Sequence, residues 1–165
     1  MARALEAYRP LAYIQEPGTL DGGDVLRLGQ HIYVGLSGRS NWSAVTQFRE
    51  IVSKFAYVVH EVPVSGCLHL KSAVTQVSAD TLLINPAWIS RDAFSGWRLL
   101  EIASGEDYAA NALLVGEKVI YPTSFPATRG RLEENGIPVV ALDISELQKA
   151  EGAVTCCSLI FHHEV

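Results

Sequence analysis

Apolar and polar residues alternate along the chain in short blocks whose order repeats. In residues 20–64, two apolar segments about a turn predict two strands. An alternating segment at 57–64 predicts a third strand. Between them lies a stripe of helical period, which predicts a core-facing helix capped by Ser40 or Asn41 and is formed by Val45, Phe48, Ile51, Val52 and Phe55. This first unit therefore has the order strand, strand, helix, strand.

The same order recurs further along the chain, and such repeats take precedence over local assignments. The second unit is predicted to have strands at 73–77, 81–84 and 98–102, with a helix at 90–94. The third has strands at 112–114, 119–121 and 138–142, with a helix that begins near Pro126 and ends before Gly136. Outside the units, the pattern predicts short helices at 1–10 and 145–149, a strand at 11–14, and a strand at 152–161 that begins a fourth unit.

Each unit starts with an ionisable or nucleophilic residue beside a strand. The starts fall near residues 21, 69, 107 and 153. Units repeated around an axis bring their starts together at the centre. We therefore expect Asp21, His69 and Cys156 to converge, although they lie far apart in sequence.

Composition limits the class of protein. The 165 residues are 48% hydrophobic and 19% charged, which is typical of one well-buried globular domain spanning residues 1–165. A net charge of −5 without a basic run argues against nucleic acid as a partner. No apolar stretch reaches the ~18 residues that span a bilayer, and the first residues lack a signal-peptide core, so we expect a cytoplasmic protein. Three cysteines make no disulfide framework, and we expect all three to be reduced.

Cysteine, histidine and aspartate together suit nucleophilic catalysis. A free thiol is only a few per cent thiolate at neutral pH, so a cysteine nucleophile needs a base or a cationic neighbour. Cys156 is the candidate nucleophile, His69 the candidate base, and Asp21 the carboxylate that orients the imidazole. By the alternation of a strand, Cys157 is expected on the opposite side and buried.

Each candidate also has a purely structural explanation. Cys156 fits a core cysteine, His69 fits a polar residue satisfied by backbone groups, and the segment from Asp21 to Asp24 fits a turn. Cys67 and His69 have the spacing of metal ligands, but no second cluster accompanies them, so we expect no metal site. His162 and His163 are expected in an exposed polar tail.

Five ordered motifs resemble dimethylargininase, also called dimethylarginine dimethylaminohydrolase. They are Gly18–Val25, Gly35–Asn41, His69–Ser72, Asp107–Asn111 and Thr155–Ser158. The match runs from about residue 11 to 161 and corresponds to the carboxyl-terminal portion of the family. The resemblance implies the pentein fold, an α/β propeller of five ββαβ blades in the guanidine-modifying superfamily. Here about three blades and the first strand of another are expected.

The resemblance also implies a reaction and the roles of five residues. Cys156 attacks the guanidinium carbon of an Nω-methylated arginine, His69 is the general acid and base, and Asp21 is its carboxylate partner. Arg39 corresponds to the residue that binds the substrate α-carboxylate, and the backbone at Ala150 faces the amino-acid end. A covalent thiouronium intermediate yields citrulline and methylamine or dimethylamine, without metal or organic cofactor.

The chain departs from the family pattern in one respect. The amino-terminal blades, which include an acidic segment that grips the guanidinium, are missing, so we expect a fragment, a short gene product or a partial propeller completed by association. The chain alone is expected to be poorly active, and to self-associate or pair with an amino-terminal half. The alternatives are an arginine or agmatine deiminase, disfavoured because Lys71 stands where those enzymes carry an acid, and a non-catalytic pentein module.

Overall fold

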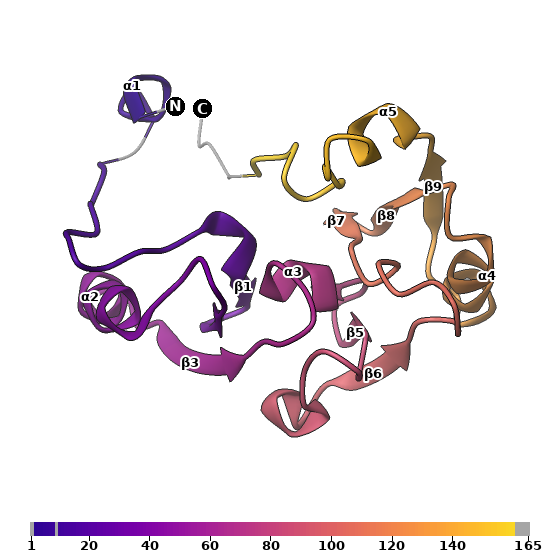
Figure 1. Ribbon diagram of the computed structural model, residues 1–165, viewed down its shortest axis with the longest axis horizontal. Helices are drawn as coiled ribbons and strands as arrows, with labels where there is room; N and C mark the ends of the chain where they lie inside the picture. The colour runs from indigo at the N-terminus through magenta and orange to yellow at the C-terminus, as the bar shows by residue number, and fades with distance from the viewer. Residues whose placement is uncertain (1, 9, 161–165) are drawn as a thin grey trace.

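Three small sheets follow one another along the chain, each with the same order and pairing of strands (Figure 1). The computed structural model describes residues 2–8 and 10–160. In each sheet the first two strands pair antiparallel, and the third pairs parallel to the middle one. A parallel neighbour cannot be reached through a tight turn, so each unit needs a crossover connection. The predicted repeat of two strands, a helix and a strand is therefore confirmed.

The bounds of the elements follow the predicted repeat closely. The first unit contains β1 (Val25–Leu28), β2 (His31–Leu36), α2 (Trp42–Ser53) and β3 (Val58–Pro63). The second contains α3 (Leu70–Ala73), β4 (Val74–Gln76), β5 (Thr81–Ile84), the 3-10 helix η2 (Arg91–Phe94) and β6 (Arg98–Glu101). The third contains β7 (Leu113–Val115), β8 (Lys118–Pro122), α4 (Pro126–Glu134) and β9 (Val139–Leu142). Outside them lie α1 (Ala2–Leu5), the 3-10 helix η1 (Gly22–Asp24) and α5 (Ser145–Gln148).

The two longer helices begin and end as their sequences predict. The side chain of Asn41 accepts a hydrogen bond from the backbone N–H of Ala44 and caps α2. Pro126 occupies the first turn of α4, and Gly136, with φ of 74°, follows its last turn. Phe55 lies beyond the end of α2 and is exposed, so it was wrongly assigned to the helical stripe.

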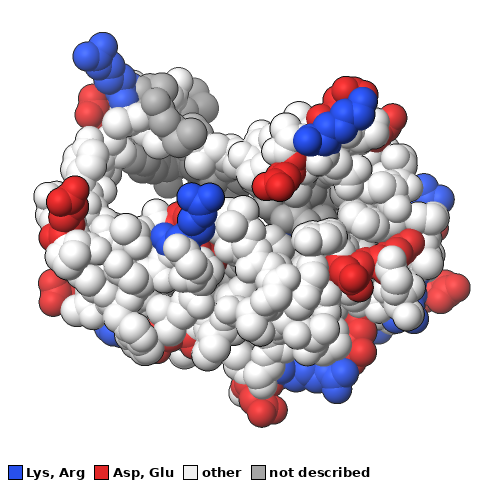
Figure 2. All heavy atoms as spheres, viewed as in Figure 1, with Lys and Arg blue, Asp and Glu red and all other residues white. Residues whose placement is uncertain are grey.

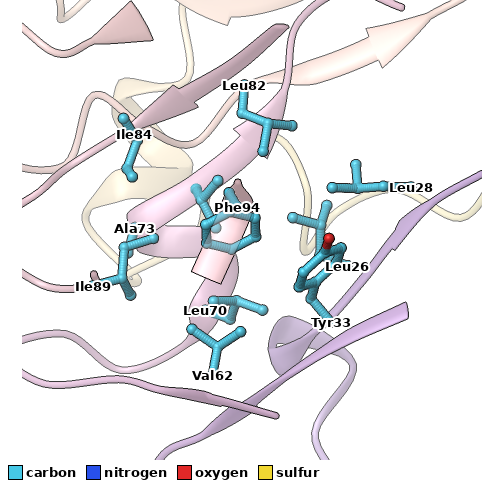
Figure 3. Close-up of a cluster of buried hydrophobic side chains, with 11 residues drawn as sticks. Leu26, Leu28, Tyr33, Val62, Leu70, Ala73, Leu82, Ile84, Ile89 and Phe94 are labelled. Carbon is cyan, nitrogen blue, oxygen red and sulfur yellow. The ribbon is translucent and has the colours of Figure 1, made fainter. Parts of the chain in front are cut away.

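Buried apolar side chains join neighbouring units. One cluster, shown in Figure 3, lies between the first and second units and contains side chains from β1, β2, β3, α3, β5 and η2. A second cluster joins the second and third units through Val77, Leu83, Val119 and Tyr121. The short helix α3, which the sequence did not predict, lies near the centre of Figure 1 and packs into the first of these clusters.

Two predicted strands are wrong. Residues 11–14 form no strand, and the backbone N–H and C=O of the next residue, Gln15, bind the side chain of Gln47 on α2. Residues 153–160 form turns rather than the first strand of a fourth unit. Within the described residues no strand pairs with this segment, whose backbone N–H groups bond to near neighbours, as from Ser158 N–H to Thr155 C=O, or to the Asn111 side chain. The remainder of this predicted strand, with His162 and His163, lies outside the described residues.

The described residues contain no membrane-spanning helix, and the face shown in Figure 2 has no basic patch. Within residues 2–8 and 10–160, none of the helices combines the length and apolar character needed to cross a membrane. In Figure 2, acidic and basic side chains of the described residues are interspersed, and most lie towards the periphery of the face in view. That distribution gives nucleic acid no continuous basic surface on this face.

Candidate active site

One cavity of about 680 Å³ contains all three candidate catalytic residues. Asp21 reaches it from the first unit, His69 from the start of the second, and Cys156 from the segment after α5. Its wall also contains Gly23, Lys71, Tyr108, Asn111, Phe125, Gly152 and Thr155. A smaller cavity of about 400 Å³, between the β4–β5 turn and the end of α4, contains none of the candidates. All three candidates therefore line one cavity, as expected, but Cys156 does so from a turn and not from the start of a fourth unit.

Asp21 and His69 form an ion pair at the cavity wall. Asp21 Oδ2 lies 3.2 Å from His69 Nε2, while Asp21 Oδ1 accepts a hydrogen bond from the Gly23 N–H at 3.1 Å. The His69 contact lacks hydrogen-bond alignment, and Nε2 has no other partner. The pKa of Asp21 is held below its ordinary value first by the Gly23 N–H, and then by His69 and Arg39, against the opposing effect of burial. Asp21 is thus a carboxylate placed beside the imidazole.

Gly23 leaves the room that the His69 ring occupies. A Cβ atom at position 23 would lie 2.5 Å from Cγ and 2.8 Å from Nδ1 of His69. At the neighbouring Gly22, an added Cβ meets no atom within 4 Å. The absence of a side chain at Gly23 therefore permits the close approach of the imidazole to the η1 backbone, whereas a side chain at Gly22 would not obstruct it.

Asp24 is a buried carboxylate that links the segments carrying Asp21 and His69. Its Oδ2 accepts hydrogen bonds from the hydroxyls of Ser37 and Ser40, at 2.6 and 2.7 Å. Its Oδ1 accepts from the N–H of Leu70 at 2.9 Å, immediately after His69. Ser40 Oγ in turn accepts from the N–H of Asp21 at 3.0 Å. Asp24, with 0% exposure, thus links the backbones of Asp21 and His69 from behind the cavity.

Cys156 lies in a turn with its thiol exposed, and not in a strand. Its Sγ accepts a hydrogen bond from the Ala153 N–H at 3.1 Å and contacts the Ala153 C=O at 3.2 Å. Cys157 is also exposed, which corrects the prediction that it is buried. That prediction depended on strand alternation, and the turn removes the alternation. Cys157 is absent from the cavity wall, so of the two thiols the cavity includes only Cys156.

Cys67 does not act with His69 as a pair of metal ligands. Its thiol donates to the backbone C=O of His69 at 3.3 Å, and burial raises the pKa of Cys67 to about 11. Among residues 2–8 and 10–160, no three His, Cys, Asp or Glu side chains are grouped closely enough to hold a metal ion.

Arg39 and Ala150 lie near the cavity but are not part of its wall. Arg39 is exposed, and its charge contributes to the lowered pKa of Asp21. Ala150 is exposed directly after α5, next to Glu151 and Gly152, which do line the cavity.

Two residues of the cavity wall were missed as site residues by sequence reasoning. Lys71 is half-buried near Asp21, Asp24 and Cys156, and burial lowers its pKa. Asn111 is 8% exposed and contacts the segment that carries Cys156. The only sequence signal for either was membership of a family-like motif, which gave no role.

Comparison with known proteins identifies relatives that align with most of this chain. No protein-family model matches the chain. Over 148 residues it is 35% identical to N(G),N(G)-dimethylarginine dimethylaminohydrolase of Pseudomonas aeruginosa, and 41% identical to the protein of the same name from Streptomyces coelicolor. These alignments cover 90% and 89% of this chain, but 58% and 56% of the relatives. The chain thus spans little more than half the length of the curated relatives it matches.

Solved structures agree with the sequence comparison. A Cys→Ser mutant of the P. aeruginosa enzyme, complexed with citrulline, superposes with a TM-score of 0.83 at 34% identity, covering 90% of this chain and 58% of that one. An amidinotransferase from Microseira wollei superposes with a TM-score of 0.81 at 15% identity, covering 96% of this chain and 54% of that one, and shows the fold alone.

The α/β units give this chain the fold that amidinotransferases and other pentein enzymes share. Within that class the sequence is homologous to the dimethylarginine dimethylaminohydrolases, which are enzymes, over about nine tenths of its own length.

Proposed function

We propose that this chain carries the catalytic side chains of a hydrolase that converts Nω-methylated arginine to citrulline and methylamine or dimethylamine. The observation that carries the proposal is the shared cavity, which is lined by Asp21, His69 and Cys156 from three separate segments of the chain, and in which His69 Nε2 lies 3.2 Å from Asp21 Oδ2. Relatives named dimethylarginine dimethylaminohydrolase support the substrate class.

The proposed reaction has two halves and uses the chain's own side chains. The Cys156 thiolate adds to the guanidinium carbon, and His69 donates a proton to the departing amine, which leaves a thiouronium adduct on sulfur. His69 then removes a proton from water, which attacks the same carbon, and the carbon–sulfur bond breaks to release citrulline. Asp21 orients the imidazole and stabilises its charged form. In this proposal no step uses a metal or cofactor.

Two further residues would bind the amino-acid end of the substrate. Arg39 would pair with the α-carboxylate through its planar guanidinium, which suits a bidentate contact. The backbone at Ala150 would face the same end from the side of α5. We place the activity in the cytoplasm, because a free thiol nucleophile needs reducing surroundings.

Binding of the substrate guanidinium would depend on completion of the fold. The three sheets would be blades of a partial propeller, completed by self-association or by an amino-terminal half of the kind found in the longer relatives. Exposed apolar side chains on β9, Val140 at 46% and Leu142 at 50%, support an uncovered face there.

The product assay tests this function. The chain is incubated with asymmetric dimethylarginine, alone and with the amino-terminal half of the P. aeruginosa relative, and citrulline and dimethylamine are measured. Equal amounts of both products are expected, with turnover rising when the second half is added. Ammonia released from unmethylated arginine would instead indicate a deiminase. Absence of every product, together with an unreactive Cys156, would indicate a non-catalytic module.

Gly23→Ala is expected to lower the reactivity of Cys156 towards 2-chloroacetamidine, a small cationic amidine electrophile, by about a hundredfold. The added Cβ displaces the His69 ring, and a misplacement of about 1 Å can cost that much. Gly22→Ala is the matched control and should leave the rate within about twofold, because its Cβ meets open space. Labelling rates are measured by mass spectrometry, and equal losses in both variants would contradict the role of the Gly23–His69 contact.

A further inference from the structure

In the described part of the chain, one asparagine makes the hydrogen bonds that link the turn carrying Cys156 to residues outside 147–158. Asn111 Nδ2 donates to Thr155 Oγ1 at 2.9 Å, and Asn111 Oδ1 lies 3.4 Å from the Thr155 N–H. In the described part of the chain, the other hydrogen bonds of residues 152–160 go only to residues 147–158. The side chain of Val154 is buried and packs the turn against the protein. Apolar packing is non-directional, so it does not fix the orientation of the turn.

The same amide also reaches the segment that carries His69. Asn111 Nδ2 donates to the backbone C=O of Lys71 at 2.9 Å, two residues after His69. This carbonyl lies in the four-residue helix α3, which is too short to satisfy its own carbonyls. The Asn111 side chain therefore bridges the turn that carries Cys156 and helix α3, which begins directly after His69.

The backbone on both sides of Asn111 is itself fixed. The hydroxyl of Thr75, which is 2% exposed, donates to Ala110 C=O at 2.6 Å and accepts from Ala112 N–H at 3.1 Å. Asn111 is 8% exposed, so its amide is largely shielded from competing water. A buried, fully bonded amide on a fixed backbone is a rigid spacer.

We propose that Asn111 is a positioning residue that sets the place of Cys156 relative to His69. The inference rests on the proposed function, because it assumes that these two side chains act together. Without Asn111, the turn keeps its local bonds and the thiol stays exposed, but the turn loses its directional link to α3. Reactions that depend on the geometry of both residues are then slowed, while the general accessibility of the thiol is unchanged.

The test compares two electrophiles on the full chain, with labelling at Cys156 resolved by peptide mass spectrometry. Iodoacetamide reports accessibility, and 2-chloroacetamidine reports a thiol placed beside the Asp21–His69 pair. Asn111→Ala is expected to lower the ratio of amidine rate to iodoacetamide rate about tenfold. Thr155→Val is expected to lower the ratio less, because the Thr155 N–H still faces Asn111 Oδ1. Thr155→Ser keeps the hydroxyl and is expected to retain the wild-type ratio. The double variant Asn111→Ala with Thr155→Val should be no worse than Asn111→Ala alone.

Asn85→Ala is the matched control, because it also removes a buried, hydrogen-bonded side-chain amide. Asn85 is 4% exposed and makes two hydrogen bonds to loop backbone, to Asp107 C=O and from Ala87 N–H, without touching residues 152–160. It is expected to lower the unfolding temperature about as much as Asn111→Ala, with no change in the ratio.

The outcomes separate this inference from the proposed function. A wild-type chain without preference for the amidine would overturn the proposed function. A wild-type preference that survives Asn111→Ala, or that Asn85→Ala lowers equally, would overturn the positioning role while the proposed function stands.

Discussion

Cys156→Ser is expected to abolish labelling of the chain by 2-chloroacetamidine and to lower any turnover by at least about a thousandfold. A serine hydroxyl is a far weaker nucleophile than a thiol at neutral pH, and Cys156 is the thiol on the cavity wall. Intact-mass spectrometry counts the adducts, and peptide mapping locates them. Retention of an amidine adduct in this variant, at the wild-type rate, would show that another residue is the nucleophile.

Cys157→Ser is the matched control and is expected to keep the labelling rate within about threefold. Both thiols are exposed, so accessibility alone does not distinguish them. Cys157 lies outside the cavity wall, and its pKa is raised first by its hydrogen-bond contact with Cys156, 3.9 Å between the two sulfurs. A raised pKa leaves less of Cys157 in the thiolate form at neutral pH. Equal sensitivity to both substitutions would contradict the assignment.

Asp24→Ala is expected to be the most destabilising single substitution proposed, with a loss of about 3 kcal/mol in the free energy of unfolding. It leaves the N–H of Leu70 and two serine hydroxyls without their acceptor in a buried place, and each unsatisfied donor costs about 1–3 kcal/mol. For a chain of this length the midpoint of thermal unfolding should fall by about 6–12 °C.

Asp143→Ala provides the comparison for the loss of an aspartate at an exposed position. Asp143 accepts a hydrogen bond from the N–H of Ser145 at 2.9 Å, but it is exposed, so water replaces the lost bond. Its unfolding midpoint should stay close to that of the wild type. Urea unfolding followed by circular dichroism measures both variants, and similar midpoints for the two would show that the buried hydrogen bonds of Asp24 contribute little.

The sequence predicted the three units well because each has strong local signals. The stripe on α2, Pro126 with Gly136 around α4, and the paired strands about glycine turns agree with one another. Local propensity and packing favour the same structure in these segments, which is where sequence-based inference succeeds. The repeat predicted that Asp21, His69 and Cys156 share one site, and all three line one cavity, but Cys156 reaches it from a turn and not from a fourth unit.

The sequence-based predictions failed where contacts between residues distant in sequence, and not the local pattern of apolar residues, determine the structure. The apolar segment 153–160 has the composition of a strand, but a strand needs a neighbour, and none is present beside it. Helix α3 is four residues long, and the Asp24 carboxylate accepts the N–H of its first residue from 46 positions away in sequence. The contact of Asn111 with Thr155 spans 44 positions. Periodicity over a short window cannot indicate such contacts.

The division of the cavity among three separate segments of the chain has a consequence for synthesis on the ribosome. Each sheet pairs strands that are close in sequence, so each unit has the local contacts needed to form soon after it emerges. The carboxylate and the imidazole are then in place early, while the thiol at position 156 is added only after all three sheets have been translated. A nascent chain arrested before α5 would therefore be folded but would lack the Cys156 thiol. Covalent labelling at Cys156 would then report when the last stage of co-translational folding is reached.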